Sequence, residues 1–406
     1  MIITATGQIL LLSGLTIVGL LVNRVLKLEL TLSCALVGLL TGLSLGFVNV
    51  DTGIRHHNLQ DLVFFIILPV LIFEAAWHLK LHLLKRWILP ILVLAVVGVL
   101  ISCVVTAALI YLGIGHSVGF PWIAALLTGA ILAATDPVAV ISQLHANDAP
   151  DDLTTLFEGE SLFNDATGIV LFTIVLGFAT QTWSEGANFV TYFASVFFGG
   201  IVVGLVMGLM AAAICAFVAN SVASKFILVF TAFASFYCAE HLFHVSGILA
   251  VTIAALTTRF MLDKADAVLT QGVAETWAWL GLFFNSLLFV LMGLVVTLNM
   301  FTERWLAILI AIVASLVARA VAVMFCSLVT KPLPNSISIG WQILLVWGGL
   351  RGAIAIALVL SLPTSLPYWW TIQSAVFGVV AFSMLVQGTS NSMLIKKFGR
   401  PNVNSL

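Results

Sequence analysis

Apolar segments long enough to cross a lipid bilayer follow one another along almost the whole chain. The mean hydropathy is +1.19, and only 8% of the 406 residues are charged, against about 25% in globular proteins. A backbone that faces lipid must satisfy its own hydrogen bonds, so each segment is expected to be a helix. The sequence therefore predicts an all-α polytopic membrane protein surrounded by membrane lipids.

Hydropathy separates thirteen expected spans of about 20 residues each, joined by short loops. No linker or soluble domain is visible, so residues 1–406 are expected to form a single integral membrane domain. The expected spans cover residues 7–23, 30–47, 60–78, 87–113, 120–144, 155–180, 190–219, 225–241, 246–260, 276–298, 304–329, 337–362 and 370–395.

Basic residues are distributed unevenly between the two sets of alternate loops. Twelve of the sixteen Lys and Arg residues lie in one set or at the C-terminus, and two lie in the other set. Because cytoplasmic loops are enriched in Lys and Arg, the C-terminus is expected in the cytoplasm and, with thirteen spans, the N-terminus outside. The expected location is the plasma (inner) membrane. A net charge of -1 gives no reason to expect a nucleic-acid partner.

Two of the spans contain residues that interrupt helices. Asp136-Pro137 lies deep in the fifth span, where Asp favours an N-cap and Pro the first helical position. Gly348-Gly349 and Arg351-Gly352 mark the twelfth span in the same way. A kink or a packing contact is the alternative for either pattern taken alone. Backbone that leaves the helical form inside a membrane lines a cavity or is buried in protein, so both positions are candidates for a binding site.

The two interrupted spans lie seven spans apart, and an odd offset inverts the orientation of a repeat. Residues 1–180 and 225–396 are therefore expected to be inverted repeats, with residues 190–219 as the connecting helix. Interrupted helices at corresponding positions of two repeats indicate the binding site of a transporter.

Three carboxylates, those of Asp136, Glu160 and Asp165, lie inside apolar spans. An ionised group persists in a bilayer only where it is paired, hydrated or bound to an ion. A rise of about 1.5 Å per residue puts Asp136 roughly 12 Å, and Asp165 and Arg319 each roughly 15 Å, from the cytoplasmic side. We therefore expect Asp136, Asp165 and Arg319 to share one layer of the membrane.

The sixth span has one polar face. At about 100° per residue, Glu160, Ser161, Asn164 and Asp165 fall within an arc of roughly 140°, which offers oxygen ligands to a small cation. A poorly solvated carboxylate holds a proton more readily than one in water, so a proton and a cation compete for it. Asp165 is our candidate for this group, and the pattern favours an ion-coupled transporter.

The alternative is that these acids only pair with arginines to fix helix packing. Four intramembrane acids, the three above and Glu74, face two intramembrane arginines, Arg319 and Arg351. At least two acids therefore lack a fixed partner, which favours a functional role over a purely structural one. Serines within the spans lack a GxSxG context, so an enzyme is not expected, and neither is a cofactor.

Four stretches carry a resemblance to a known family. Ala134–Ala139, Phe157–Gly168, Trp347–Ala353 and Phe73-Glu74 resemble the sodium/proton exchangers of the monovalent cation:proton antiporter superfamily, in its NhaP-like electroneutral branch. The resemblance implies a thirteen-helix fold with a six-helix core domain and a dimerisation domain, working as a homodimer. It also implies that spans 5 and 12 are unwound and cross beside the ion site.

The resemblance further assigns roles to individual residues. It makes Asp165 the principal carboxylate for Na⁺ and H⁺, and it adds Ser161, Glu74 and the backbone carbonyl of Thr135 as Na⁺ ligands. Asn164 matches the position that marks electroneutral members.

Three more residues receive structural roles. Asp136 matches a position that holds the unwound stretch together. Glu160 and Arg351 match an ion pair between spans 6 and 12, and Arg319 matches a cation that balances the crossed half-helices.

These expectations combine into one function. The chain is expected to exchange Na⁺, and also Li⁺, for H⁺ by an elevator-like movement of the core, and so to serve pH homeostasis. A K⁺/H⁺ exchanger is the alternative within the class, and a cation channel or a non-transporting membrane subunit is the alternative outside it.

Overall fold

The computed structural model describes residues 5–48, 62–181, 189–265, 270–332 and 334–399. Nearly all regular structure in these ranges is helical, and nine of their helices are long and apolar enough to cross a membrane. Two shorter apolar helical stretches cover 30–44 and 63–78. The all-α polytopic fold class is therefore confirmed, while the total of thirteen spans stays a prediction.

The chain folds into two compact units that alternate along the sequence. The first unit contains residues 1–53, 82–183 and 289–406, and the second contains residues 54–81 and 184–288. The proposed inverted repeats and the connecting helix stay predictions.

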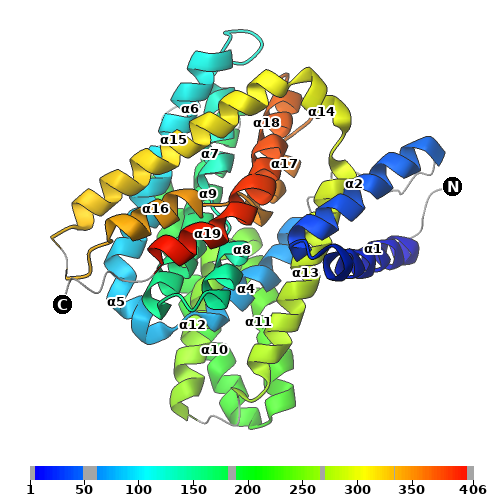
Figure 1. Cartoon of the computed structure of the whole chain (residues 1–406). Coiled ribbons are helices and arrows are strands. Elements are labelled where there is room, and N and C mark those ends of the chain that lie inside the picture. The colour runs from blue at the N-terminus through cyan, green and yellow to red at the C-terminus, as the bar shows by residue number, and fades with distance from the viewer. Residues whose placement is uncertain (1–4, 49–61, 182–188, 266–269, 333, 400–406) are drawn as a thin grey trace. The chain divides into compact units, whose positions relative to one another are not determined.

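The first unit begins with the helix pair α1 (Ala5–Leu26) and α2 (Leu30–Val48), and it holds both interrupted spans (Figure 1). The middle stretch of this unit contains α5 (Leu81–Leu92), η2 (Val93–Gly98), α6 (Val99–Ile114), α7 (Trp122–Ala133), α8 (Val138–Ala146) and α9 (Asp151–Ala179). After residue 289 come the end of α13 (Val273–Val295), α14 (Leu298–Glu303), α15 (Trp305–Thr330), α16 (Ile339–Trp347), α17 (Ala353–Leu360), α18 (Trp369–Phe382), η5 (Ser383–Gly388) and α19 (Thr389–Phe398).

Small residues let the helices of the first unit approach closely. Helix α6 packs against α7 and α15, α7 packs against α9, and α15 packs against α18. A Cβ atom added to Gly129 on α7 would lie 2.4 Å from the carbonyl oxygen of Cys103 on α6. A Cβ atom on Gly38 of α2 would lie 2.2 Å from the carbonyl oxygen of Val290 on α13. Backbone-to-backbone contact of this kind drives helix association in membranes, where lipid supplies little hydrophobic driving force.

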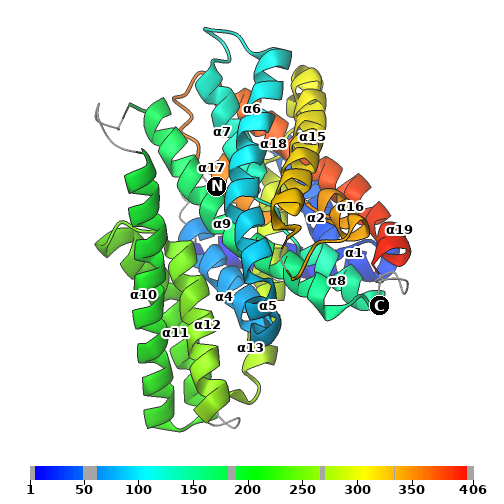
Figure 2. The ribbon, with the colours of Figure 1, turned by 90° about the vertical axis from the view of Figure 1, so that its left-hand side faces the viewer.

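The second unit contains a close pair of helices, α10 and α12, with small residues in their contact. An added Cβ atom on Gly204 or Gly208 of α10 would lie 2.5 or 2.8 Å from a carbonyl oxygen of α12, and one on Gly200 would lie 2.7 Å from the carbonyl oxygen of Ser246, just before α12. Figure 2 shows α10, α11 and α12 side by side. The helices of this unit are η1 (Val63–Ile67), α4 (Leu68–His78), α10 (Phe189–Val218), α11 (Ser221–Tyr237), η3 (Cys238–Leu242), α12 (Gly247–Ala265) and the first part of α13.

Candidate functional site

Both predicted helix interruptions are present and they contact each other. Helix α7 ends at Ala133 and α8 begins at Val138, while α16 ends at Trp347 and α17 begins at Ala353. The backbone N–H of Asp136, in the first break, donates to the carbonyl oxygen of Leu350 in the second, at 2.8 Å. The two discontinuous helices therefore meet at their non-helical segments, which lie within the first unit.

The Asp136 carboxylate holds the start of both following half-helices. Its Oδ1 accepts a hydrogen bond from the Val138 N–H and its Oδ2 accepts one from the Ala353 N–H, each at 3.0 Å. A carboxylate at a helix N-terminus satisfies free N–H groups and lies at the favourable end of the helix dipole. A Cβ atom on Gly352 would lie 2.0 Å from Oδ2, so only glycine leaves room for this double cap.

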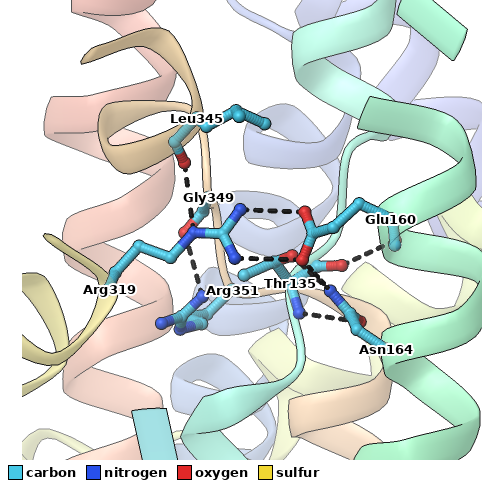
Figure 3. A network of polar contacts seen from close by, with 8 residues as sticks. Thr135, Glu160, Asn164, Arg319, Leu345, Gly349 and Arg351 are labelled. Carbon is cyan, nitrogen blue, oxygen red and sulfur yellow. Dashed lines mark hydrogen bonds and ion pairs between the residues drawn. The ribbon is translucent and has the colours of Figure 1, made fainter. Parts of the chain in front are cut away.

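The polar face of α9 is fastened to the first break. The Ser161 hydroxyl donates to the Thr135 carbonyl oxygen at 2.7 Å. The Asn164 Nδ2 donates to Thr135 Oγ1 at 2.7 Å and to Glu160 Oε1 at 2.8 Å (Figure 3). The predicted face of the sixth span thus meets the predicted break of the fifth span, and its amide and hydroxyl groups hold Thr135 in a non-helical conformation.

Glu160 is paired with a different arginine from the one expected. Arg319 Nη1 and Nη2 donate to the two Glu160 oxygens at 2.9 and 2.8 Å, and Arg319 Nε donates to the Leu345 carbonyl oxygen at 3.1 Å. Glu160 and Arg319 are only 1% and 5% exposed. The planar guanidinium fork matches both carboxylate oxygens, which makes this a strong charge-assisted contact.

The expected Glu160–Arg351 ion pair is therefore wrong. Arg351 Nη1 instead donates to the Gly349 carbonyl oxygen at 3.1 Å, and its Nε has no hydrogen-bond partner among the described residues. The reason is that Arg319 already occupies both Glu160 oxygens. Figure 3 shows the two guanidinium groups one above the other beside the second break.

Asp165 differs from its neighbours because its carboxylate is free. It makes no hydrogen bond or ion pair with any residue that the structure describes, and it is partly exposed. The Asp136 and Glu160 carboxylates lie within electrostatic range of it. Asp136 and Glu160 accept hydrogen bonds on both of their oxygens, so Asp165 is the carboxylate of this cluster that is freest to accept a proton or a cation.

Glu74, the remaining predicted ligand, belongs to the second unit. Its Oε1 lies 3.3 Å from Nδ1 of His78, one turn further along α4. The assignment of Glu74 to the ion site stays a prediction. The sequence analysis did not predict His78 as a partner of Glu74.

Two groups of the first unit were not predicted. Ser383 and Gln387 of η5 hold the second break: the Arg351 N–H donates to Ser383 Oγ at 3.3 Å and Gln387 Nε2 donates to the Trp347 carbonyl oxygen at 2.8 Å. Glu29, between α1 and α2, lines a cavity of about 320 Å³ beside the breaks. An acid just before an apolar span is indistinguishable from an ordinary interface residue, so no signal in the sequence points to Glu29.

Known proteins are similar to this chain over most of its length. The family described as "Sodium/hydrogen exchanger, transmembrane" matches residues 11–397. The Na(+)/H(+) antiporter ApNhaP of Aphanothece halophytica is 34% identical over 378 residues, which are 89% of this chain and 68% of that protein. The Na(+)/H(+) antiporter NhaH of Halobacillus dabanensis is 30% identical over 406 residues, 97% of each chain.

The fold has a counterpart among solved structures. The structure of the sodium proton antiporter MjNhaP1 from Methanocaldococcus jannaschii at pH 8 matches with a TM-score of 0.82. The match covers 97% of this chain and 99% of that chain at 23% identity. At this level of identity the likeness bears on the fold, and it agrees with the fold class expected from the sequence.

Proposed function

Because the chain belongs to the sodium/hydrogen exchanger family, we propose that it is a secondary active antiporter that exchanges Na⁺ for H⁺. One observation carries the proposal: Asp165 is a carboxylate without a partner in the described part of the chain, near two acids whose oxygens already accept hydrogen bonds. The names of the relatives as Na(+)/H(+) antiporters support the choice of ions.

The site binds either ion through the same group. A proton or a Na⁺ ion neutralises the Asp165 carboxylate, and neither binds well while the other is present. The Thr135 carbonyl oxygen and the Ser161 hydroxyl, which are hydrogen-bonded to each other, are further proposed Na⁺ ligands. Such oxygens replace the water shell that the ion loses on binding. Asn164 and Asp136 keep the non-helical backbone in place around them.

Exchange also requires that the loaded site reach both sides of the membrane. The Glu160–Arg319 pair joins α9 to α15, and the bond of Arg319 to Leu345 joins α15 to α16. These contacts support an elevator-like movement in which the two breaks and α9 travel as one body. With the free carboxylate of Asp165 and the amide of Asn164 beside it, the exchange is proposed to be electroneutral, with Li⁺ as a second substrate.

The arrangement of the chain in its membrane is part of the proposal. The bias of Lys and Arg in the loops supports a cytoplasmic C-terminus and an N-terminus outside, in the plasma (inner) membrane. A homodimer is expected from the family resemblance.

The test is exchange in proteoliposomes. An imposed pH gradient, followed with a pH-sensitive dye, is expected to collapse on addition of Na⁺ or Li⁺. A response to K⁺ but not Na⁺ indicates the K⁺/H⁺ alternative, and cation flux without coupled proton movement indicates a channel.

The matched variants are Asp165→Asn and Asp148→Asn. Asp165→Asn is expected to abolish exchange while the protein stays folded. Asp148 is exposed in a loop with a positive φ of 51°, which Asn tolerates, so Asp148→Asn is expected to leave exchange unchanged. Retained wild-type exchange in Asp165→Asn would defeat the assignment.

A further inference from the structure

A cavity of about 320 Å³ opens beside the contact between the two breaks. Asp136 of the first break and Arg351 and Gly352 of the second break form part of its wall. Glu29 and Thr31, from the start of α2, form another part of the same wall. All of these residues belong to the first unit, so the cavity lies within one compact body.

The Glu29 side chain lies against the end of η5. Its Oε2 lies 3.4 Å from the position that a Cβ atom on Gly388, the last residue of η5, would occupy. The Gly388 carbonyl oxygen accepts a hydrogen bond from Gln143 Nε2 of α8 at 2.8 Å. Glu29, the end of η5 and α8 therefore meet, and the Glu29 carboxylate is held at the cavity beside the half-helix that Asp136 caps.

Arg351 is a buried cation without a direct carboxylate partner among the described residues. It is 3% exposed, it donates to the Gly349 carbonyl oxygen, and its Nε is unpaired. Leaving a buried charge uncompensated is costly. Both Glu160 oxygens are taken by Arg319, and both Asp136 oxygens accept backbone N–H groups. Glu29 is the remaining acid in the wall of the cavity.

The surroundings of Glu29 also change the pKa of its carboxyl group. Burial raises the pKa of the Glu29 carboxyl above its usual value, and the nearby charge of Asp136 raises it further. A hydrogen bond with the Thr31 side chain lowers the pKa and partly offsets both effects. Arg351 faces the same cavity from α16–α17. Proton uptake by Glu29 therefore occurs closer to neutral pH than for a glutamate in water.

We propose that Glu29 is a positioning residue of the exchange pathway: its carboxylate, near Asp136 in a cavity that Arg351 also lines, gives the cavity a net negative charge and so sets the affinity for the incoming cation. The inference rests on the proposed function. With Glu29 and Asp136 ionised and Arg351 charged, the cavity carries one net negative charge, which suits a monovalent cation. Protonation of Glu29 cancels that charge, and the cavity then attracts cations less.

A purely structural role for Glu29 makes a different prediction. Its carbonyl oxygen accepts from the Ser33 N–H at 2.9 Å, so the residue also starts α2, where an acid stabilises the helix through its dipole. Loss of such a cap lowers stability but leaves the Na⁺ affinity and the pH dependence of exchange unchanged.

The experiment compares Na⁺ concentration series at several pH values in proteoliposomes for Glu29→Gln, Glu29→Asp and the wild-type chain. For Glu29→Gln we expect the half-saturating Na⁺ concentration to rise about tenfold while the maximal rate stays within about twofold, because a focusing charge is lost but the Asp165 site is not. In the wild-type chain this concentration is expected to fall as the pH rises, because protons leave Asp165 and Glu29 ionises. The Gln variant is expected to show a smaller fall, because only the competition at Asp165 remains.

Two controls separate charge from fold. Glu29→Asp keeps the charge and is expected to recover most of the Na⁺ affinity. Glu303→Gln removes an exposed carboxylate at the end of α14 and is expected to behave as the wild-type chain.

The result that would overturn the role of Glu29 differs from the result that would overturn the proposed function. A Glu29→Gln protein with unchanged half-saturating Na⁺ and an unchanged pH profile, whether or not its melting temperature falls, overturns the role of Glu29 alone. A wild-type chain without Na⁺-dependent exchange overturns the proposed function, and the role of Glu29 with it.

Discussion

The ion pair between Glu160 and Arg319 can be tested through the stability of the protein. Arg319→Met removes a guanidinium that donates to both Glu160 oxygens and to the Leu345 carbonyl oxygen, and it leaves Glu160, 1% exposed, without that partner. Breaking a buried pair from one side costs about 3–5 kcal/mol. We therefore expect Arg319→Met to lower the free energy of unfolding by about 4 kcal/mol. With an unfolding entropy of about 2.1 cal/mol/K per residue over 406 residues, the melting temperature should fall by about 5 °C.

The assay is thermal unfolding in detergent, followed by tryptophan fluorescence, with two comparisons. The double variant Arg319→Met/Glu160→Met removes both charges and is expected to recover much of the loss, which a double-mutant cycle measures as a coupling energy. Arg86→Met breaks an exposed contact, 3.4 Å from Asp152, and is expected to cost at most about 1 kcal/mol.

The reasoning is refuted if Arg319→Met costs no more than Arg86→Met. If Arg351→Met proves far more destabilising than Arg319→Met and couples to Glu160 instead, the pairing expected from the family resemblance holds in the membrane. Either result would mean that Arg319 does not neutralise Glu160.

The remaining predictions concern the breaks and the face of α9. Gly352→Ala is expected to prevent the double cap, because its Cβ atom would lie 2.0 Å from Asp136 Oδ2; expression and exchange should both fall, whereas Gly14→Ala, with no atom within 4 Å of its Cβ, should be silent in the same assays. Asn164→Asp replaces a donor that lies 2.8 Å from Glu160 Oε1 by a second acceptor. We expect this change to lower thermal stability and not by itself to create voltage-driven exchange, because Arg319 and Asp136 also set the charge balance. Na⁺ uptake driven by a membrane potential in this variant would contradict that role of Arg319 and Asp136.

Local patterns predicted the two breaks and the polar face of α9 correctly. Asp-Pro and the paired glycines act through the backbone of a few adjacent residues, so their effect on a helix can be read without knowing its neighbours. The spacing of Glu160, Ser161 and Asn164 places them on one side of any helix, and Thr135 is the residue that they meet. Local sequence patterns were sufficient here because the geometry that they predict is that of a single helix.

Depths estimated from the rise per residue predicted less of the site. A rise per residue places Arg319 in a layer with Asp136 and Asp165, but it says nothing about the direction in which the side chain leaves its helix. The long guanidinium side chain reaches Glu160, about one helical turn away from that layer. Depth therefore left the partner of each charged group open, and the expected Glu160–Arg351 pair came from the family resemblance.

By itself the sequence determined the all-α membrane fold, the positions where two helices break, and the set of charged groups kept away from water. Those properties follow from hydropathy, helix periodicity and the conformational limits of Pro and Gly, all of which act over a few residues. Only the tertiary structure decided that Arg319 and not Arg351 pairs with Glu160, that Asp136 caps two half-helices at once, and that Glu29 faces the breaks. Each of these contacts joins residues more than a hundred positions apart, and their meeting depends on the rotation and packing of whole helices.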